Sequence, residues 1–340
     1  MEPIIYKLPK PDKPIAPDAK NIYFDAYPSP KLIKYGFNSM SEQLDLVELT
    51  KVPYYKAGLH FDFSRKGKDT IADSGNKSFA IKDFDQTFAE FWEIITMFDL
   101  FKKDTSVLTS HEDTVRDIIK AYTTLNKSKN KLDLVKGKAK ADLVFHKLSD
   151  TDIDENAAIQ LITMDLPKLL SSQSPGSNMV LQIFSTQTQI MAEIIYYLAS
   201  NYEEAYLVKP SIISEIFDEK YLVLINLIAD PKFNLPKHRS NDFLSSLGLE
   251  PPTDFETSIQ CMNAELLPAK FKKYYEIKAY LDTKVYEGAT YQEMLADQDD
   301  DTDKWIATFT DLSKPPAILD ARLKKSDTKC KRRSDLINSL

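Results

Sequence analysis

The sequence predicts an α/β fold: a largely parallel sheet with flanking helices, an extended N-terminal arm and a C-terminal helical lobe. Between residues 155 and 228, short apolar runs alternate with amphipathic helical segments, which is the pattern of βαβ units. Residues 1–38 are rich in proline and have no long periodic pattern, as expected of an extended arm that gains structure by lying on another part of the protein. Beyond residue 254 the apolar spacing becomes helical.

We therefore divide the chain into an N-terminal extension (residues 1–82), an α/β core (83–230) and a mostly helical C-terminal lobe with a basic tail (231–340). In the core, Phe88, Trp92 and Ile95 lie at helical spacing. In chain order, the expected elements of its first half are a helix over 83–102, a strand over 106–109, a helix over 113–125, a basic loop over 127–140 and a strand over 141–145.

The second half of the core contains the clearest alternation of strands and helices. The expected elements are a helix over 156–170, a turn at 174–177, a strand over 179–184, a helix over 187–200, and strands over 204–208 and 220–228. Residues 231–254 read as a loop, followed by two mostly helical segments over 255–286 and 291–309.

Composition excludes several classes of protein. Cys261 and Cys330 are the only cysteines, too few for a disulfide framework, so we expect a reducing compartment. No apolar run approaches the roughly 20 residues needed to cross a bilayer, and the N-terminus lacks the features of a secretory signal. The chain has only eight glycines, about a third of the usual share of roughly 7%. Because glycine lets a backbone pass close to a phosphate, this scarcity argues against a nucleotide or cofactor enzyme.

Motifs of other chemistries are also missing. The four histidines (His60, His111, His146 and His238) are dispersed and none pairs with cysteine at zinc-ligand spacing, so we predict no metal site. The chain contains neither a P-loop nor the Gly-x-Ser-x-Gly elbow of hydrolases.

Charge is unevenly distributed in this chain of net charge −7. Residues 297–303 form an acidic run, and residues 322–333 form a basic tail. One interpretation is a solvated acidic loop and a loose basic terminus. The other is a tail that contacts RNA or an acidic partner.

Three short segments carry a resemblance to a known family. They are the strand Met179–Phe184, the pair Lys209-Pro210 at a strand end, and the run Glu219-Lys220-Tyr221 before a final hairpin. This order resembles the late half of the FtsJ-like RNA 2′-O-methyltransferases, and the resemblance covers roughly residues 84–228. It implies a Rossmann-like methyltransferase sheet, S-adenosylmethionine held by a Gly-rich turn, and a catalytic Lys-Asp-Lys-Glu tetrad.

The expected cofactor turn has lost its glycines. It falls on Thr109, Ser110, His111, Glu112 and Asp113, and no glycine occurs between residues 75 and 137. A turn beneath the cofactor needs small residues and free backbone N–H groups, and here β-carbons fill much of that space. We therefore predict no bound cofactor.

The catalytic tetrad is also degenerate. Its Asp position falls on Lys147 (His146 if the register slips by one), its second Lys on Gln182 and its Glu on Glu219. The first Lys, expected near the helix over 84–102, has no counterpart. We interpret Glu219 as a structural carboxylate that pairs with Lys209 or Lys220, and we predict a methyltransferase fold without methyltransferase chemistry.

A narrower resemblance concerns the regulatory small subunits of poxvirus-type mRNA-capping enzymes. It rests on residues 28–38, on Lys140-Ala141-Asp142 before a strand, and on Lys331-Arg332-Arg333 with Leu336 and Leu340. The resemblance implies a non-catalytic protein that forms a heterodimer with the capping-enzyme large subunit and stimulates its guanine-N7 methyltransferase. Its expected location is the host cytoplasm or the virion. The candidate partner contacts are the arm (residues 1–38) and the segment Gln182–Gln189, and the basic tail is a candidate contact for mRNA.

Two other functions stay open. One is an active, divergent cap 2′-O-methyltransferase that uses S-adenosylmethionine, with Lys147, Glu219 and Asp150 in reassigned roles. The other is a structural or virion interaction protein that inherited the fold.

Overall fold

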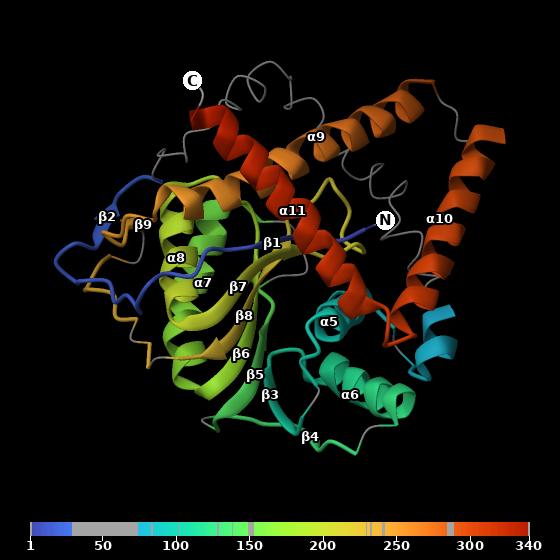
Figure 1. Ribbon diagram of the computed structural model, residues 1–340, viewed down its shortest axis with the longest axis horizontal. Coiled ribbons are helices and arrows are strands. Elements are labelled where there is room, and N and C mark those ends of the chain that lie inside the picture. The colour runs from blue at the N-terminus through green and yellow to red at the C-terminus, as the bar shows by residue number, and fades with distance from the viewer. Residues whose placement is uncertain are drawn as a thin grey trace.

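The computed structural model describes residues 2–28 and 74–338, except 83, 102, 128, 138, 149–152, 229, 232, 240–241 and 284–288. Its centre is a mixed, mostly parallel seven-stranded sheet with helices on both faces (Figure 1). Residues 29–38 of the expected arm, and Asp150, lie outside the described residues.

The sheet has the strand order β1-β7-β8-β6-β5-β3-β4. The strands β3 (Thr105–Thr109), β4 (Leu132–Leu134), β5 (Ala141–His146) and β6 (Gln173–Ile183) are parallel, and β8 (Lys220–Leu227) runs antiparallel between β6 and β7 (Tyr202–Lys209). An antiparallel edge strand, β1 (Ile4–Lys7), pairs with β7. The expected alternation of strands and helices in the core is therefore present.

Helices α5 (Gln86–Met97) and α6 (Glu112–Asn126) cover one face of the sheet, and α7 (Glu155–Ser171) and α8 (Gln189–Ser200) cover the other (Figure 1). The sheet therefore separates two hydrophobic cores, which we call the α7–α8 core and the α5–α6 core after the helices that cover them. Strand β5 contributes to both, because successive side chains of a strand point to opposite faces: Val144 belongs to the α7–α8 core and Leu143 to the α5–α6 core. Asp85, Asp154 and Thr188 cap the N-termini of α5, α7 and α8 with side-chain oxygens.

The N-terminal segment lies on the α/β core at two places. Strand β1 completes one edge of the sheet, and β2 (Tyr23–Asp25) pairs with β9 (Phe243–Ser246) in a separate two-stranded sheet. Gly248 has φ +66°, and a β-carbon there would lie 2.6 Å from the carbonyl oxygen of Asn21. Glycine therefore permits the close approach of the two segments next to this small sheet.

Three helices form the C-terminal region: α9 (Thr253–Thr283), α10 (Ala289–Phe309) and α11 (Pro315–Asn338). They share hydrophobic cores with the α/β part of the molecule. Trp305 and Phe309 of α10 belong to the same buried cluster as Phe88 and Trp92 of α5, and the Trp92 indole donates a hydrogen bond to the Phe309 carbonyl (2.8 Å). Helix α11 crosses the edge strand β1 (Figure 1).

Several sequence predictions about irregular segments are wrong. The expected loop over 127–140 contains β4, and the expected loop over 231–254 contains β9. The expected turn at 174–177 lies inside β6, where Gly176 has φ +80°. These strand segments are short or polar, and they are strands because a distant segment supplies the hydrogen-bonding partner.

The charged segments are helical as well. The acidic run over 297–303 lies in α10, and the basic tail over 322–333 lies in α11, so the interpretation as an acidic loop and a loose basic terminus is wrong. Apolar residues of α10 and α11, including Trp305, Leu319 and Leu323, pack against the α5–α6 core and thereby order both helices.

Candidate functional site

Four polar side chains meet inside the protein: Glu90, Lys147, Gln182 and Glu219, all buried. We call them the buried polar cluster. Lys147 directly follows β5, Gln182 lies near the end of β6, and Glu219 directly precedes β8. Because β8 is antiparallel to β6, pairing Gln182 with Tyr221, all three side chains reach the same edge of the sheet. Glu90 joins them from the first half of α5.

Lys147 is the centre of this cluster. Its ammonium Nζ lies 2.9 Å from Glu90 Oε2 and 3.6 Å from Glu219 Oε1, and it donates a hydrogen bond to Thr87 Oγ1 (3.1 Å). The Tyr221 hydroxyl donates to Glu90 Oε2 (2.6 Å). One ammonium group is thus held between two carboxyl groups inside the protein.

Gln182 links the cluster to the backbone. Its amide nitrogen donates to Glu219 Oε1, and its amide oxygen accepts from the backbone N–H of Leu148 (2.6 Å). Both ends of the amide are therefore occupied by protein groups, which satisfies the polar atoms that burial removes from water.

Burial raises the pKa of Glu219 to about 8, and the nearby Glu90 carboxylate adds to that shift. Lys147 and the hydrogen bond from Gln182 act in the opposite direction, but burial dominates. Glu219 therefore holds a proton at neutral pH, and the cluster contains less net negative charge than its two carboxyl groups indicate.

The structure brings together all three residues that the sequence resemblance assigned to degenerate tetrad positions: Lys147, Gln182 and Glu219. It adds Glu90, which sequence analysis missed. The available signal was a glutamate beside Phe88, Phe91 and Trp92 in a helix that is buried on almost all sides. A carboxylate in such surroundings needs a buried partner, here Lys147.

Glu219 does not use the partners expected from the sequence. The Lys209 ammonium donates to the backbone carbonyls of Phe217 (2.7 Å) and Glu219 (3.3 Å), not to the Glu219 carboxylate. The Lys220 ammonium donates to the carbonyls of Phe184 and Asp218. Both lysines tie the loop before β8 to neighbouring strands through backbone atoms.

The expected cofactor turn connects β3 to α6 and lies next to a cavity of about 230 Å³. The residues around it come from the ends of β3, β4 and β5, from the start of α6 and from α7: Leu108, Thr109, Ser110, Glu112, Val135, Lys136, Gly137, Val144, Phe145, His146, Asp165, Lys168 and Leu169. His111 and Asp113 of the turn do not line it. The cavity lies at the carboxyl ends of β3 and β5, between the helices that go to opposite faces, where open α/β sheets bind ligands.

The residues of this turn do not fit S-adenosylmethionine. The cavity is smaller than the roughly 300–1,000 Å³ of typical small-molecule sites. The backbone N–H of His111 donates to Thr109 Oγ1 (3.0 Å), so a side chain uses one of the donors that a ligand would need. Glu112 forms an ion pair with Lys136 (2.5 Å) between two lining segments.

His146 and Asp165 form a polar pair on the wall of this cavity. His146 Nε2 lies 3.0 Å from Asp165 Oδ2, and burial lowers the pKa of His146 despite that carboxylate. His146 is the last residue of β5 and lies at the cavity. Of the two residues considered for the Asp position of the tetrad, it is Lys147, directly after the strand, that enters the buried polar cluster.

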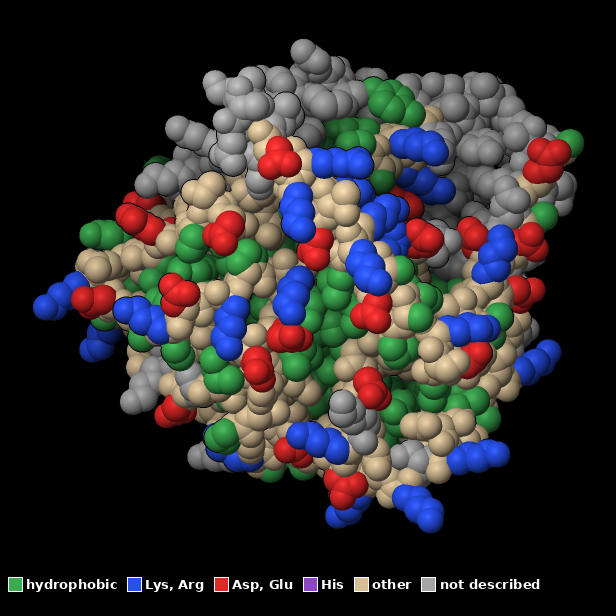
Figure 2. All heavy atoms as spheres, in the orientation of Figure 1, with side chains coloured by type: hydrophobic (Ala, Val, Ile, Leu, Met, Phe, Trp, Pro, Cys, Tyr) green, Lys and Arg blue, Asp and Glu red, His purple; other side chains and the backbone are tan. Residues whose placement is uncertain are grey.

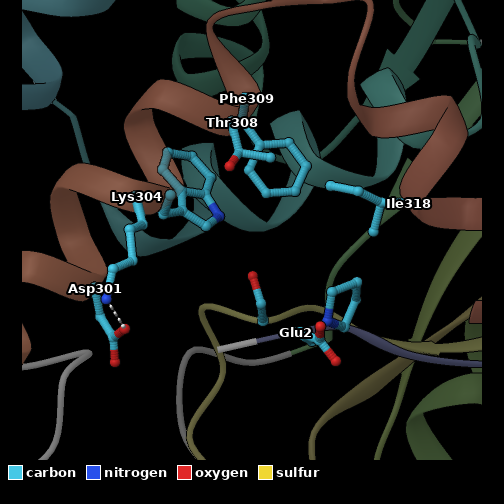
Figure 3. Close-up of a pocket in the computed structure, with 9 residues that line it drawn as sticks. Glu2, Asp301, Lys304, Thr308, Phe309 and Ile318 are labelled. Atoms are coloured by element: carbon cyan, nitrogen blue, oxygen red, sulfur yellow. Dashed lines mark ion pairs between the residues drawn. The ribbon is translucent and has the colours of Figure 1, made fainter.

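A second cavity, of about 240 Å³, lies between the N-terminal residues, α10 and α11 (Figure 3). Lys304 and Asp301 form an ion pair at its side (3.7 Å). Ser211 also lines this cavity. The backbone N–H and the hydroxyl of Ser211 both donate hydrogen bonds to the Glu93 carboxylate. Burial raises the pKa of Glu93 to about 7. The Trp305 indole donates to the same Glu93 carboxylate (2.9 Å), and this hydrogen bond joins α10 to α5.

The proposed contact surface over Gln182–Gln189 is mostly buried. Gln182, Phe184 and Thr186 are inaccessible, and the Thr186 hydroxyl donates to Asn263 of α9 (2.7 Å). The prediction of a partner contact along this segment is therefore wrong, because α9 covers it.

In the part of the chain that the structure describes, no three histidine, cysteine or acidic side chains are grouped to hold a metal ion. Among the same residues, no helix combines the length and apolar character needed to span a bilayer.

Comparison with known proteins gives one informative relationship. No family model matches the chain. The chain is 43% identical over 344 aligned residues to a protein of Acanthamoeba polyphaga mimivirus named "Uncharacterized protein R383", and the alignment covers 99% of both chains.

Proposed function

This chain belongs to the same family as the mimivirus protein R383, and we propose that it is a non-catalytic subunit of a viral-type mRNA-capping enzyme. In this proposal it binds the large subunit and stimulates its guanine-N7 methyltransferase. We place the complex in the host cytoplasm or the virion. The observation that carries the proposal is that the charged groups of the buried polar cluster are buried and bind one another.

A catalytic centre for methyl transfer must expose its charged groups to a ribose hydroxyl. In this protein Glu90, Lys147 and Glu219 are buried and contact one another. The position of the family's catalytic Asp is a lysine, and the position of its second Lys is an uncharged Gln182 hydrogen-bonded at both ends. Such a network stabilises the fold and leaves no free base for the hydroxyl, which supports a non-catalytic role.

The topology supports the methyltransferase-like part of the proposal. Strand β8 is inserted antiparallel between β6 and β7, an arrangement that Rossmann-like methyltransferase sheets share. Glu219 directly precedes that strand and Tyr221 is its second residue, an order that the resemblance to the 2′-O-methyltransferases implies.

Stimulation without catalysis follows from linkage. A subunit that binds the active conformation of its partner more tightly than the inactive one shifts that equilibrium, typically by about 1–3 kcal/mol. That free energy corresponds to a change of about 5-fold to 150-fold in the population ratio. The subunit therefore need not touch the substrate in order to raise the rate.

The basic face of α11 is our proposed mRNA contact within this complex. Lys324, Lys325, Lys331 and Arg332 are exposed and lie within about one third of the helix circumference, given 3.6 residues per turn. Figure 2 shows the face that α11 crosses, where basic and acidic side chains are interspersed. Phosphate contacts of this kind are local and salt-dependent.

The decisive experiment is co-expression of the chain with the capping-enzyme large subunit of the same genome. We expect a heterodimer and an N7-methylation rate above that of the large subunit alone. Absence of a complex together with an unchanged rate would defeat the proposal. Replacing the four α11 cations by alanine is expected to preserve the complex and weaken RNA binding most at low salt.

A second candidate function is an active, divergent cap 2′-O-methyltransferase. The location of the cavity at the carboxyl ends of β3 and β5 favours it, whereas the small volume of that cavity opposes it. Calorimetric titration with S-adenosylmethionine separates the two functions. Micromolar binding by the isolated chain would favour the enzyme, and no heat change would favour the regulatory subunit. A virion structural protein would show neither cofactor binding nor stimulation of the large subunit.

A further inference from the structure

The only two cysteines of this chain lie on two helices, α9 and α11, that pack against each other in the folded protein. Cys261 is on α9 and Cys330 is on α11, 69 positions later. Both are free thiols; Cys261 is buried, and Cys330 is partly exposed and packs against the hydrophobic core that includes Cys261. Nothing in the sequence spacing predicts this proximity, since it arises from the packing of α11 on α9.

Polar contacts hold the two helices in register beside the thiols. Glu265, one turn beyond Cys261 on α9, forms an ion pair with Lys329 of α11 (2.6 Å) and accepts a hydrogen bond from the Tyr6 hydroxyl of β1 (2.7 Å). The Ser326 hydroxyl, one turn before Cys330, donates to the Ile5 carbonyl of the same strand. Cys261 and Cys330 therefore lie in the region where α9, β1 and α11 pack together, which we call the junction.

The two thiols are electrostatically unlike. A hydrogen bond from the Cys330 thiol lowers the pKa of Cys261, and Arg333 and Lys329 lower it further, against the effect of burial. The same hydrogen bond, together with burial, raises the pKa of Cys330. The other charged groups around the junction are Glu265, Lys325 and Asp327. The basic side chains of Lys329 and Arg333 favour a thiolate at Cys261, and Cys330 on the facing helix is the thiol that completes a disulfide.

We propose that Cys261 and Cys330 are a peroxide-sensitive dithiol that forms a reversible disulfide between α9 and α11. The oxidant is hydrogen peroxide or an organic hydroperoxide. The Cys261 thiolate attacks the peroxide oxygen, the O–O bond breaks, and with hydrogen peroxide the products are a sulfenic acid and water. The Cys330 sulfur then attacks the Cys261 sulfur and displaces a second water. Two thiols are oxidised, one peroxide is reduced, and a cellular dithiol reverses the reaction by exchange.

The disulfide would cross-link the two helices that pack on β1. Because it closes a loop of about 70 residues, it restricts the unfolded chain and raises the melting temperature. It also ties the edge strand β1 more firmly between α9 and α11. Peroxide would thereby stabilise the junction at the N-terminal strand without changing the buried polar cluster.

The test is titration of the full-length reduced protein with hydrogen peroxide, followed by intact-mass analysis and non-reducing peptide mapping. We expect a mass loss of about 2 Da from the two lost hydrogens, one cross-linked peptide pair containing Cys261 and Cys330, and reversal by dithiothreitol. The melting temperature is expected to rise on oxidation. A stable sulfenic acid trapped by dimedone with no cross-link, or disulfides only between molecules, would overturn the proposal.

Variants make the result independent of folding defects. Cys330→Ser replaces a partly exposed side chain and is expected to abolish the cross-link and leave a sulfenic acid on Cys261. Lys329→Met, which removes the cation that lowers the Cys261 pKa, is expected to slow disulfide formation several-fold. Lys331→Met, on the exposed face of the same helix, is the matched control and should react at the wild-type rate. Equal rates for Lys329→Met and Lys331→Met would count against the assigned role of Lys329.

Discussion

The buried polar cluster and the β3–α6 turn lie at the same edge of one sheet but differ in how their polar groups are satisfied. In the cluster, Lys147 is buried between Glu90 and Glu219. At the turn, Glu112 pairs with the largely exposed Lys136, and a cavity remains beside them. In the buried polar cluster the polar groups satisfy one another inside the protein, whereas at the β3–α6 turn an exposed ion pair lies beside an unfilled cavity.

This difference shows what burial requires of charged side chains. Charges that face a substrate can be solvated, but charges that face one another inside a protein must be balanced. The cluster has two carboxyl groups around one ammonium, and Gln182 and Tyr221 supply the remaining hydrogen bonds. The predictions below test this contrast, beginning with the largest expected effect.

Replacing Lys147 by methionine should be the most damaging change. It leaves Glu90 and Glu219 buried together without a cation, and breaking a buried ion pair from one side costs about 3–5 kcal/mol. The free energy of unfolding from urea titration measures the loss. Glu90→Gln with Lys147→Met should recover part of it, because the double variant removes the buried charge from both sides. A loss below about 1 kcal/mol for Lys147→Met would show that the cluster is solvated.

The pH dependence of stability should differ between wild type and Glu219→Gln. The pKa of Glu219 rises from 4.5 to about 8 in the folded protein, so its contribution is complete below about pH 4.5 and is lost as the pH rises through about 8. The total change is on the order of a few kcal/mol, since each pKa unit corresponds to about 1.36 kcal/mol. Chemical denaturation between pH 5 and 9 should show a flatter profile for the variant. Parallel profiles would contradict the raised pKa.

Filling the cavity beside the β3–α6 turn should hinder ligand binding there and leave the free energy of unfolding nearly unchanged. Ser110 is exposed at the cavity wall, so Ser110→Trp is expected to change the unfolding free energy by no more than about 0.5 kcal/mol. Under the regulatory function, stimulation of the large subunit should be unchanged. Loss of stimulation in a folded, complex-forming Ser110→Trp variant would assign the cavity a functional role.

A similarly small effect on stability is expected at the surface ion pair. Lys136→Met removes the partner of Glu112, but exposed ion pairs contribute only about 0–1 kcal/mol. Thermal unfolding at low and high salt should show a small difference that salt removes. A loss as large as that of Lys147→Met would erase the contrast between the two regions.

Local pattern predicted the regular elements of the α/β core well. The helices at 86–97, 112–126, 155–171 and 189–200 agree with the expected segments to within a few residues, because their apolar periodicity is strong. The strands β4 and β9 were missed because they have little local signal and depend on pairing with β3 and β2. Glu90 was missed for a related reason, since its partner Lys147 lies 57 positions away.

The order of apolar and polar residues specifies the helices and most strands of the α/β core, because hydrophobic periodicity is a property of neighbouring residues. It also places Lys147, Gln182 and Glu219 at strand ends. Folding alone determines that Lys147 binds Glu90 rather than water, that α9 covers the segment after β6, and that the helices carrying the two cysteines pack together. These outcomes depend on contacts between segments far apart in the chain, and the burial that makes their charges and thiols unusual exists only after those contacts form.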